Sequence, residues 1–155
     1  MARIDLVDLA HSYGGNDAAP ESFALKPVTM TWRQGGAYAL LGPSGCGKTT
    51  LLNLISGIVT PSRGKILFDG ADITPLSTRE RNIAQVFQFP VIYDTMTVAE
   101  NLAFPLKNRG VAPARIKQRV GQIAEMLEMS GQLDLRAAGL AADAKQKISL
   151  GRGLV

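Results

Sequence analysis

The sequence predicts an α/β fold in which strands and one helix come first and a mostly helical stretch begins near residue 97. The first observation is a loose alternation of polar and apolar residues over 3–13 and 23–32, which is typical of strands. The second is the short apolar run Ala37–Leu41, which stops abruptly at Gly42-Pro43 as a central parallel strand does. The third is the change after residue 97 to helix-capping and helix-period signals.

Turn and cap signals place the shorter elements of the first part of the chain. The polar and glycine residues of Gly14–Asp17 mark a loop after the first strand. A helix is predicted over Thr49–Ile55, ending near Gly57. A short strand at Gly64–Phe68 then leads into Asp69-Gly70, a strong turn dipeptide. We expect these strands to form the start of an antiparallel sheet.

Two capping boxes, Ser77-x-x-Glu80 and Thr97-x-x-Glu100, each predict the start of a helix, a short one in the first case. Ile83–Phe87 is predicted as a further strand between them. We expect Pro105 to stop the second helix. Pro113 begins a longer helix. The apolar positions on one face of this helix are Ile116, Val120, Ile123 and Leu127.

The composition excludes several classes of protein. With 155 residues, 46% of them apolar and 19% charged, the chain is not disordered, collagen-like or a coiled coil. One cysteine and one histidine cannot make an internal disulfide, a zinc cage or a His-based metal site. No apolar run approaches the roughly 20 residues that span a bilayer, and no signal peptide is recognisable. The net charge of +4 favours a solvated basic face over a nucleic-acid groove.

The strongest motif is the segment Gly42–Thr49, GPSGCGKT, which satisfies the phosphate-loop pattern G-x-x-x-x-G-K-[ST] between an apolar run and a helix. Glycines allow successive amides to point inward around a phosphate. Lys48 would reach the β- and γ-phosphates of ATP, and the Thr49 hydroxyl would bind Mg²⁺. Cys46 is interpreted as a small filler rather than a redox switch, and a glycine-rich turn without ligand is the alternative for the loop. The predicted nucleotide-binding residues here are Gly42, Pro43, Ser44, Gly45, Cys46, Gly47, Lys48, Thr49 and Thr50.

Over Gly42–Gly57, GPSGCGKTTLLNLISG, the sequence resembles the ATPase subunits of ATP-binding-cassette (ABC) transporters, and the resemblance extends over the whole chain. The segments Val86–Gln88 (VFQ) and Thr97–Gly110 (TVAENLAFPLKNRG) are most similar to the sequences of importers of sugars and polyols, such as bacterial glycerol importers. The resemblance implies a P-loop core with an N-terminal antiparallel β subdomain and a helical subdomain. It divides the chain into 1–96, with the β subdomain and half of the core, and 97–155, with the helical subdomain.

The resemblance also assigns two residues outside the phosphate loop. Gln88 lies where the family has its Q-loop glutamine, which contacts Mg²⁺ and the attacking water and senses the γ-phosphate. Tyr13 matches the aromatic residue that stacks on adenine in this family, and such stacking is worth about 1–3 kcal/mol in single-strand binders. Lys48 and Gln88 are thus the expected catalytic residues, and Thr49 and Gln88 the expected metal ligands. A polar residue ending a strand and a plain strand-end tyrosine are the respective alternatives.

The segment Phe89–Leu106 resembles the region that receives a coupling helix from the membrane subunit of such transporters. The apolar residues within Phe89–Tyr93 need either a core or a partner to cover them, and we favour the partner. The resemblance therefore implies integral membrane subunits as partners and a peripheral location on the cytoplasmic face of the plasma membrane. We expect no nucleic-acid partner, because no aromatic residues are interleaved with the basic ones, which are Lys107, Arg109, Arg115, Lys117 and Arg119.

The chain departs from the family at the signature Leu-Ser-Gly-Gly-Gln, where 140–144 read LAADA. Ala141 has no hydroxyl and Asp143 places a negative charge where the signature faces a γ-phosphate of the opposite subunit, so a charge-assisted hydrogen bond of about 1.5–3 kcal/mol is missing. Asp143 as a simple helix N-cap is the other interpretation. We infer a second ATPase subunit with an intact signature, in a heterodimer rather than a homodimer.

The second acidic motif of the family, Asp followed by a catalytic Glu, has no counterpart, since Asp69 precedes Gly70 and comes before Gln88. The last residues read as a helix without a stop signal, so we expect the front portion of a longer protein, truncated before that motif and inactive alone. The predicted function is the ATP-hydrolysing, energy-coupling subunit of an importer of sugars or polyols. The alternatives are a non-hydrolysing nucleotide-binding fragment or degenerate subunit, and a soluble ABC ATPase without a role in transport.

Overall fold

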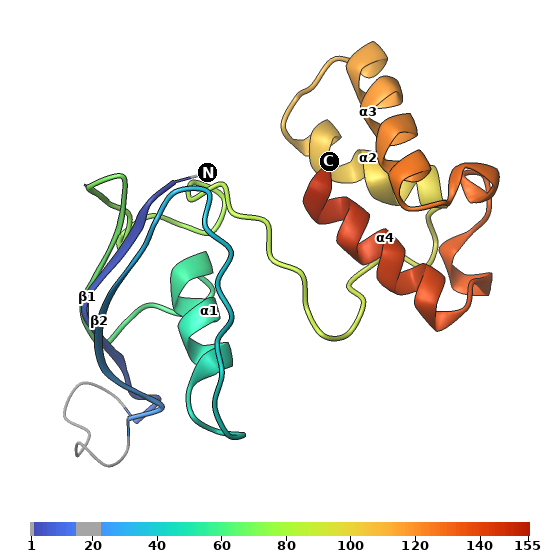
Figure 1. The fold of residues 1–155 in the computed structure, drawn as a ribbon. Coiled ribbons are helices and arrows are strands. Elements are labelled where there is room, and N and C mark those ends of the chain that lie inside the picture. Colours follow the sequence, from blue (N-terminus) through green and yellow to red (C-terminus); the bar gives the residue numbers. More distant parts are fainter. Residues whose placement is uncertain (1, 15–22) are drawn as a thin grey trace. The chain divides into compact units, whose positions relative to one another are not determined.

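The computed structural model describes residues 2–14 and 23–155, which form two compact units divided between Ile83 and Ala84 (Figure 1). The first unit combines a sheet with one helix, and the second unit is helical. Of the loop predicted at 14–17, residues 15–17 lie outside the described part of the chain. Among the residues described, no helix combines the length and the apolar character that a membrane span requires.

The first unit is built on a four-stranded antiparallel sheet with the order β2-β1-β3-β4. Its strands are β1 (Ile4–His11), β2 (Leu25–Trp32), β3 (Arg63–Phe68) and β4 (Ala71–Asp72). Leu6 of β1 is paired with Met30 of β2 and Ile66 of β3. The register shifts after Leu6, and Leu6 and Leu9 of this central strand both lie in the core shared with α1. The predicted antiparallel sheet is therefore confirmed.

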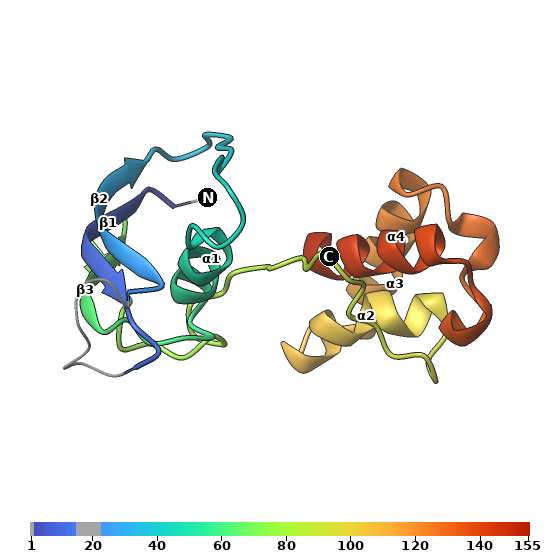
Figure 2. The same cartoon turned by 90° about the horizontal axis from the view of Figure 1, so that it is seen from below.

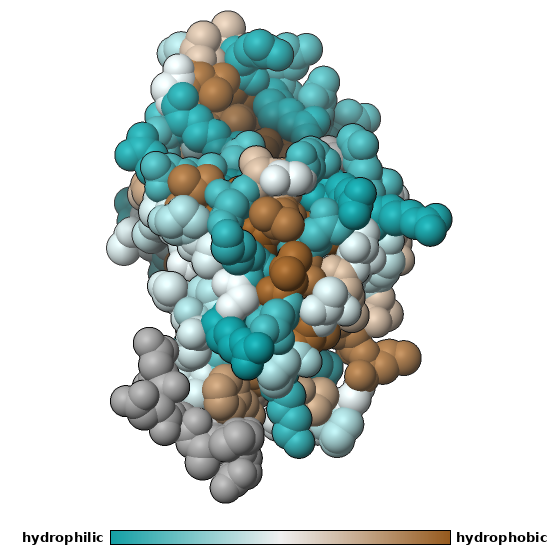
Figure 3. All heavy atoms as spheres, turned by 90° about the vertical axis from the view of Figure 1, so that its left-hand side faces the viewer, coloured by the Kyte–Doolittle hydropathy of each residue, from teal (hydrophilic) through white to brown (hydrophobic). Residues whose placement is uncertain are grey.

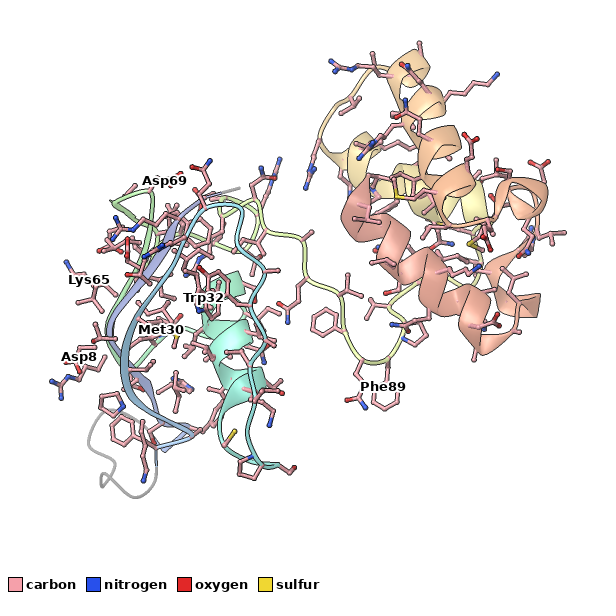
Figure 4. The ribbon with its side chains drawn as sticks, in the orientation of Figure 1. Asp8, Met30, Trp32, Lys65, Asp69 and Phe89 are labelled. Carbon is pink, nitrogen blue, oxygen red and sulfur yellow. The ribbon has the colours of Figure 1, made fainter. Side chains whose placement is uncertain are left out.

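Helix α1 (Lys48–Ser56) packs against one face of this sheet, as Figures 1 and 2 show. The residues of the shared core are Leu6, Leu9, Leu25, Leu51, Leu54, Ile55, Ile66 and Ile73. The opposite face of the sheet carries hydrophilic side chains around a narrow apolar band (Figure 3). Asp8 and Lys65 project from that face in Figure 4. The sheet thus has one buried and one solvated face, which the loose alternation in its strands reflects.

The predicted ends of the first unit's helix and hairpin are confirmed. Gly57 follows α1 with a left-handed φ of 81°, and its amide bonds back to the helix. Asp69 and Gly70 have φ values of 48° and 84°, which lets the chain reverse tightly between β3 and β4. Glycine suits positions 57 and 70, where φ is positive, because it has no Cβ.

Two strand predictions are wrong. Ala37–Leu41 and Ile83–Phe87 are irregular, and most of their residues are exposed or half-buried. A strand is stable only when a neighbour satisfies its backbone groups, and neither segment joins a ladder among the described residues. An apolar run alone therefore does not make a strand, even where its residues favour one.

The short helix predicted at Ser77 is also absent, since 78–82 form turns. Only half of the capping box forms. The Glu80 carboxylate accepts hydrogen bonds from the Ser77 backbone N–H at 2.9 Å and the Ser77 hydroxyl at 2.6 Å. The backbone N–H of Glu80 donates to the Ser77 carbonyl oxygen at 3.1 Å, whereas in a complete capping box it would donate to the Ser77 hydroxyl.

The second unit contains α2 (Val98–Asn108), α3 (Pro113–Met126) and α4 (Ala142–Leu154), with short 3₁₀ turns at Ser130–Gln132 and Ala137–Gly139. The capping box of Thr97 and Glu100 forms in full, as predicted. The predicted apolar face of α3 is also confirmed, because its four residues all lie in the core. The residues of this core are Val98, Leu102, Ala103, Leu106, Ile116, Val120, Ile123, Ala124, Leu127, Met129, Ala137 and Ile148.

Pro105 does not stop α2, contrary to the prediction, and the helix continues to Asn108. The proline removes one helical hydrogen bond and costs about 3 kcal/mol in a helix interior. Leu102 and Leu106, on either side of it, are buried in the core at 0% and 8% exposure. Burying two such side chains contributes about 1.5–3 kcal/mol each, which outweighs the proline.

Candidate nucleotide-binding site

The segment Gly42–Gly47 forms an irregular loop that leads directly into α1. Gly45 and Gly47 have left-handed φ values of 82° and 90°, which L side chains rarely adopt. A Cβ on Gly47 would also lie 2.6 Å from the backbone oxygen of Ala24, the residue before β2. Glycine at 47 is therefore required twice, by the backbone conformation and by the close approach of the preceding strand.

The side chain of Lys48 lies over this loop. Its ammonium group donates hydrogen bonds of 2.8 Å to the carbonyl oxygens of Gly42 and Pro43, and lies 3.5 Å from the Cys46 sulfur. These bonds hold a positive charge within the curve of the loop. A phosphate that enters the loop would meet this ammonium group directly.

The N-terminus of α1 adds a second attraction for anions. Its cap residue is Gly47, no side chain caps it, and its first turn has no acidic residue. Backbone N–H groups at such an end, together with the helix dipole, favour a bound phosphate. Thr49 is exposed in this turn, whereas Thr50 is buried at 9% exposure. The Thr49 hydroxyl is thus the one that is open to a ligand.

Tyr13 lies in the same unit, just after β1, and 67% of its surface is exposed. His11, two residues before it, is paired with Leu25 at the start of β2. Gly47 of the loop packs beside Ala24 and Leu25. The end of β1 that bears Tyr13 and the phosphate loop therefore adjoin the same end of β2.

Gln88 belongs to the second unit, where it is exposed in a bend. The carbonyl of its neighbour Phe87 accepts a hydrogen bond of 3.4 Å from the amide of Gln146 in α4. The structure thus groups the loop residues and Tyr13 in the first unit and Gln88 in the second.

The apolar segment Phe89–Tyr93 is only partly covered by its own unit. Ile92 packs against the helical core, whereas Phe89 and Val91 are 77% and 54% exposed. Figure 4 shows Phe89 projecting from its loop. The ring of Tyr93 lies 4.7 Å from that of Phe104 and beneath the Arg152 guanidinium, 4.6 Å away. Part of the segment is thus anchored to the unit, and two apolar side chains are left open.

Sequence reasoning missed the polar residue that fixes this segment. Asn101 of α2 is fully buried; its Oδ1 accepts from the Tyr93 N–H at 2.8 Å, and its Nδ2 donates to the Tyr93 carbonyl at 2.9 Å. Its position in the sequence was the available signal. Asn101 lies one turn into the helix that begins after Thr97, next to the apolar Leu102, so a polar side chain near the buried face could be expected. A polar side chain on a buried helix face requires partners, which here belong to the loop.

The segment 140–144, where the signature is expected from the sequence, lies at the start of α4. The N-cap is Ala141, without a side-chain hydrogen bond, so the interpretation of Asp143 as the N-cap is wrong. Asp143 lies in the first turn of the helix and is exposed. Its carboxylate is favoured there by the helix dipole, and it places negative charge at the end where an anion would otherwise bind.

Comparison with known proteins agrees with this architecture. A model of the ABC transporter family matches residues 25–155. The chain belongs to this family. An sn-glycerol-3-phosphate import ATP-binding protein, UgpC 2 of Rhizobium johnstonii, is 40% identical over 100% of this chain and 43% of its own length. A spermidine/putrescine import ATP-binding protein, PotA of Nitrosomonas europaea, is 39% identical over 100% of this chain and 41% of its own.

Solved structures of this family share the fold of the chain. The ADP conformation of MJ1267, an ATP-binding cassette of an ABC transporter, is 26% identical with a TM-score of 0.77, covering 99% of this chain and 65% of its own. The α/β fold class and the resemblance to importer ATPases of the ABC family are confirmed. Membership of the family implies nucleotide binding. The chain spans less than half the length of the two curated relatives named above.

Proposed function

We propose that this chain binds ATP with Mg²⁺ through Gly42–Thr50 and is the energy-coupling part of an importer ATPase. One observation carries the proposal. The Lys48 ammonium lies within a loop of left-handed glycines at the uncapped N-terminus of α1. A glycine-rich turn without ligand has no need of a positive charge beside an uncapped helix N-terminus.

Each residue of the loop has a distinct task in this proposal. The backbone N–H groups of the loop surround the phosphates, and Lys48 exchanges a carbonyl acceptor for a phosphate oxygen. Tyr13, exposed at the end of β1, stacks on the adenine ring. Gln88 of the second unit orients the attacking water. Lys48 and Gln88 are thus the proposed catalytic residues.

The residues present fit a magnesium ion that arrives with the nucleotide. Mg²⁺ is usually held by one or two protein oxygens together with phosphates and water. No group of three or more His, Cys, Asp or Glu side chains in 2–14 and 23–155 is placed to hold a metal. Thr49, whose hydroxyl is exposed beside the loop, and Gln88 are the proposed ligands. When bound, the ion would neutralise charge on the phosphates.

We further propose that the exposed side chains Phe89 and Val91 contact an integral membrane subunit. Apolar side chains left open by their own unit are suited to a partner surface. The relatives named above are both import ATP-binding proteins, which supports a role in import and a place on the cytoplasmic face of the membrane. The name of UgpC 2 supports the sugar, polyol or glycerol-phosphate type of solute, whereas the name of PotA supports a polyamine. Phe89→Ser should abolish co-purification with membrane subunits, whereas Val7→Ser, on the sheet, should not.

A second candidate role rests on the segment 140–144. Asp143 is exposed in the first turn of α4, and its negative charge would repel a γ-phosphate at that end of the helix. This favours a subunit that holds ATP in its own phosphate loop and pairs with a different ATPase, whose signature is intact. In this role the LAADA segment faces the weaker of two nucleotide sites. Equal hydrolysis by a homodimer and by the mixed pair would contradict it.

Calorimetric titration of MgATP into the full chain tests the proposed site. Lys48→Ala should abolish binding, because it removes the charge that faces the phosphates. Lys26→Ala is the matched control, since Lys26 is exposed on β2 of the same unit. Unchanged affinity in the Lys48 variant would overturn the assignment.

A further inference from the structure

We propose that His11 is a positioning residue for Tyr13, holding its ring where a purine base can stack on it. The proposal rests on the nucleotide-binding function proposed above. The two ring centroids lie 4.6 Å apart with an interplanar angle of 89°, which is an edge-to-face pair. Such pairs lie in the preferred range of aromatic contacts and stabilise one relative orientation of the rings.

His11 is well placed to act as a fixed support. It ends β1, pairs with Leu25, and is only 8% exposed. Its Nδ1 lies 3.3 Å from the Ser62 hydroxyl. That hydroxyl is held in turn by the backbone of Ser12, accepting from its N–H at 3.2 Å and lying 3.3 Å from its carbonyl oxygen. The imidazole is therefore anchored on two sides, by the sheet and by Ser62.

Tyr13 has the opposite environment. Two thirds of its surface is open, and it lies in a turn after the strand has ended. An exposed tyrosine loses side-chain freedom when a base stacks on it, and that loss weakens binding. A ring already held by His11 loses less of this freedom, so the support strengthens binding of the base without touching the nucleotide.

The contacts of His11 indicate which of its properties is used. The hydrogen bond of its Nδ1 is made with Ser62 and does not involve Tyr13. The contact that His11 offers to Tyr13 is the ring itself. We therefore infer that the aromatic surface, rather than the bond to Ser62, positions Tyr13.

Two substitutions separate the ring from its hydrogen bond. His11→Phe keeps a flat ring but loses the bond to Ser62, whereas His11→Gln keeps a polar group that can reach Ser62 but loses the ring. Both preserve a side chain of similar reach at this buried position. The affinities of the full chain for MgATP and for magnesium triphosphate, which has no base, are measured for each variant by calorimetry.

The expected result is a loss confined to the base. His11→Gln should weaken MgATP binding by about two- to tenfold, the value of one aromatic pair, and leave triphosphate binding unchanged. His11→Phe should bind both ligands as the native chain does. In a Tyr13→Ala background His11→Gln should have no further effect, since the two residues act as a unit.

Any other pattern overturns the proposal. Equal weakening of MgATP and triphosphate by His11→Gln would mean that His11 maintains the unit as a whole. Loss in His11→Phe with retention in His11→Gln would assign the effect to Ser62. Unchanged MgATP binding in both variants would leave His11 without a role in recognition. The proposed nucleotide site fails separately, through triphosphate binding that survives Lys48→Ala.

Discussion

The guanidinium of Arg81 donates a hydrogen bond of 2.6 Å to the backbone carbonyl of Leu54, in the last turn of α1. It also donates to the carbonyl of Ile55 at 3.0 Å, so a cation binds carbonyl oxygens at the C-terminus of the helix that begins at the phosphate loop. Two further bonds, to Leu76 and Thr74, join that helix end to the segment after β4. Arg81 is buried at 6% exposure, and this burial lowers its pKa below the usual value.

Replacing Arg81 by alanine should destabilise the first unit strongly. The substitution removes the guanidinium donor of the Ile55, Leu76 and Thr74 carbonyls, while the Leu54 carbonyl keeps the Gly57 N–H. Hydrogen bonds to a charged group are worth about 1.5–3 kcal/mol each. We expect a loss of at least about 2 kcal/mol in urea unfolding. The fluorescence of Trp32 reports on this unit, since it is the single tryptophan of the chain. Arg79→Ala, at an exposed position two residues earlier, should change stability little; a similar loss in both variants would contradict this role.

Replacing Asn101 by leucine should release the segment before α2 from the helical unit. The Tyr93 N–H would lose its acceptor at 2.8 Å, and the Tyr93 carbonyl its donor at 2.9 Å, within a partly buried environment. Each unsatisfied group costs about 1–3 kcal/mol. Hydrogen exchange at the Tyr93 amide should accelerate markedly, while Asn108→Leu, exposed at the end of the same helix, should leave it unchanged. Native-like protection at Tyr93 in the first variant would show that other contacts hold the loop.

The features predicted correctly are those whose causes lie within a few residues. The reciprocal bonds of Thr97 and Glu100, the left-handed Gly57 and the turn at Asp69-Gly70 all follow from local chemistry. The glycine pattern of the phosphate loop is local in the same sense. These signals also identified the candidate site, because a phosphate loop is one continuous segment.

The features that failed depend on residues distant in sequence. Ala37–Leu41 lacks a strand partner among the described residues, and no local pattern could reveal that. Arg81 reaches carbonyls 26 and 27 residues away, and its role is not visible in its neighbours. Pro105 is a strong local signal that burial of Leu102 and Leu106 overrides. Tertiary packing therefore decides these cases against local preference.

The hydrogen bonds that Glu80 accepts from Ser77 make the stability of the first unit depend on pH in the acid range. Hydrogen bonds from the Ser77 hydroxyl and backbone N–H lower the pKa of Glu80 below its usual 4.5. A carboxyl whose pKa is lowered on folding stabilises the fold above its unfolded pKa and loses this contribution as pH falls through the folded value. The urea midpoint of the native chain should therefore exceed that of Glu80→Gln at pH 7. The difference should vanish below the folded pKa, and a difference independent of pH would contradict this origin.

Asp143 gives the sharpest test of the paired-subunit role. In that role its carboxylate repels a γ-phosphate at the start of α4, where the signature of other family members offers backbone N–H groups. Asp143→Gly removes the charge, and combining it with Ala141→Ser restores a hydroxyl. Recovery of a charge-assisted hydrogen bond corresponds to about tenfold or more in the affinity for ATP at that site. ATP hydrolysis by the full-length dimer should rise with it, in single-turnover measurements that isolate the site.

Glu128→Gly removes a carboxylate elsewhere in the same unit, at a position whose φ of 57° suits glycine, and should leave the rate unchanged. An equal rate in native and restored proteins would mean that 140–144 supports hydrolysis as it stands.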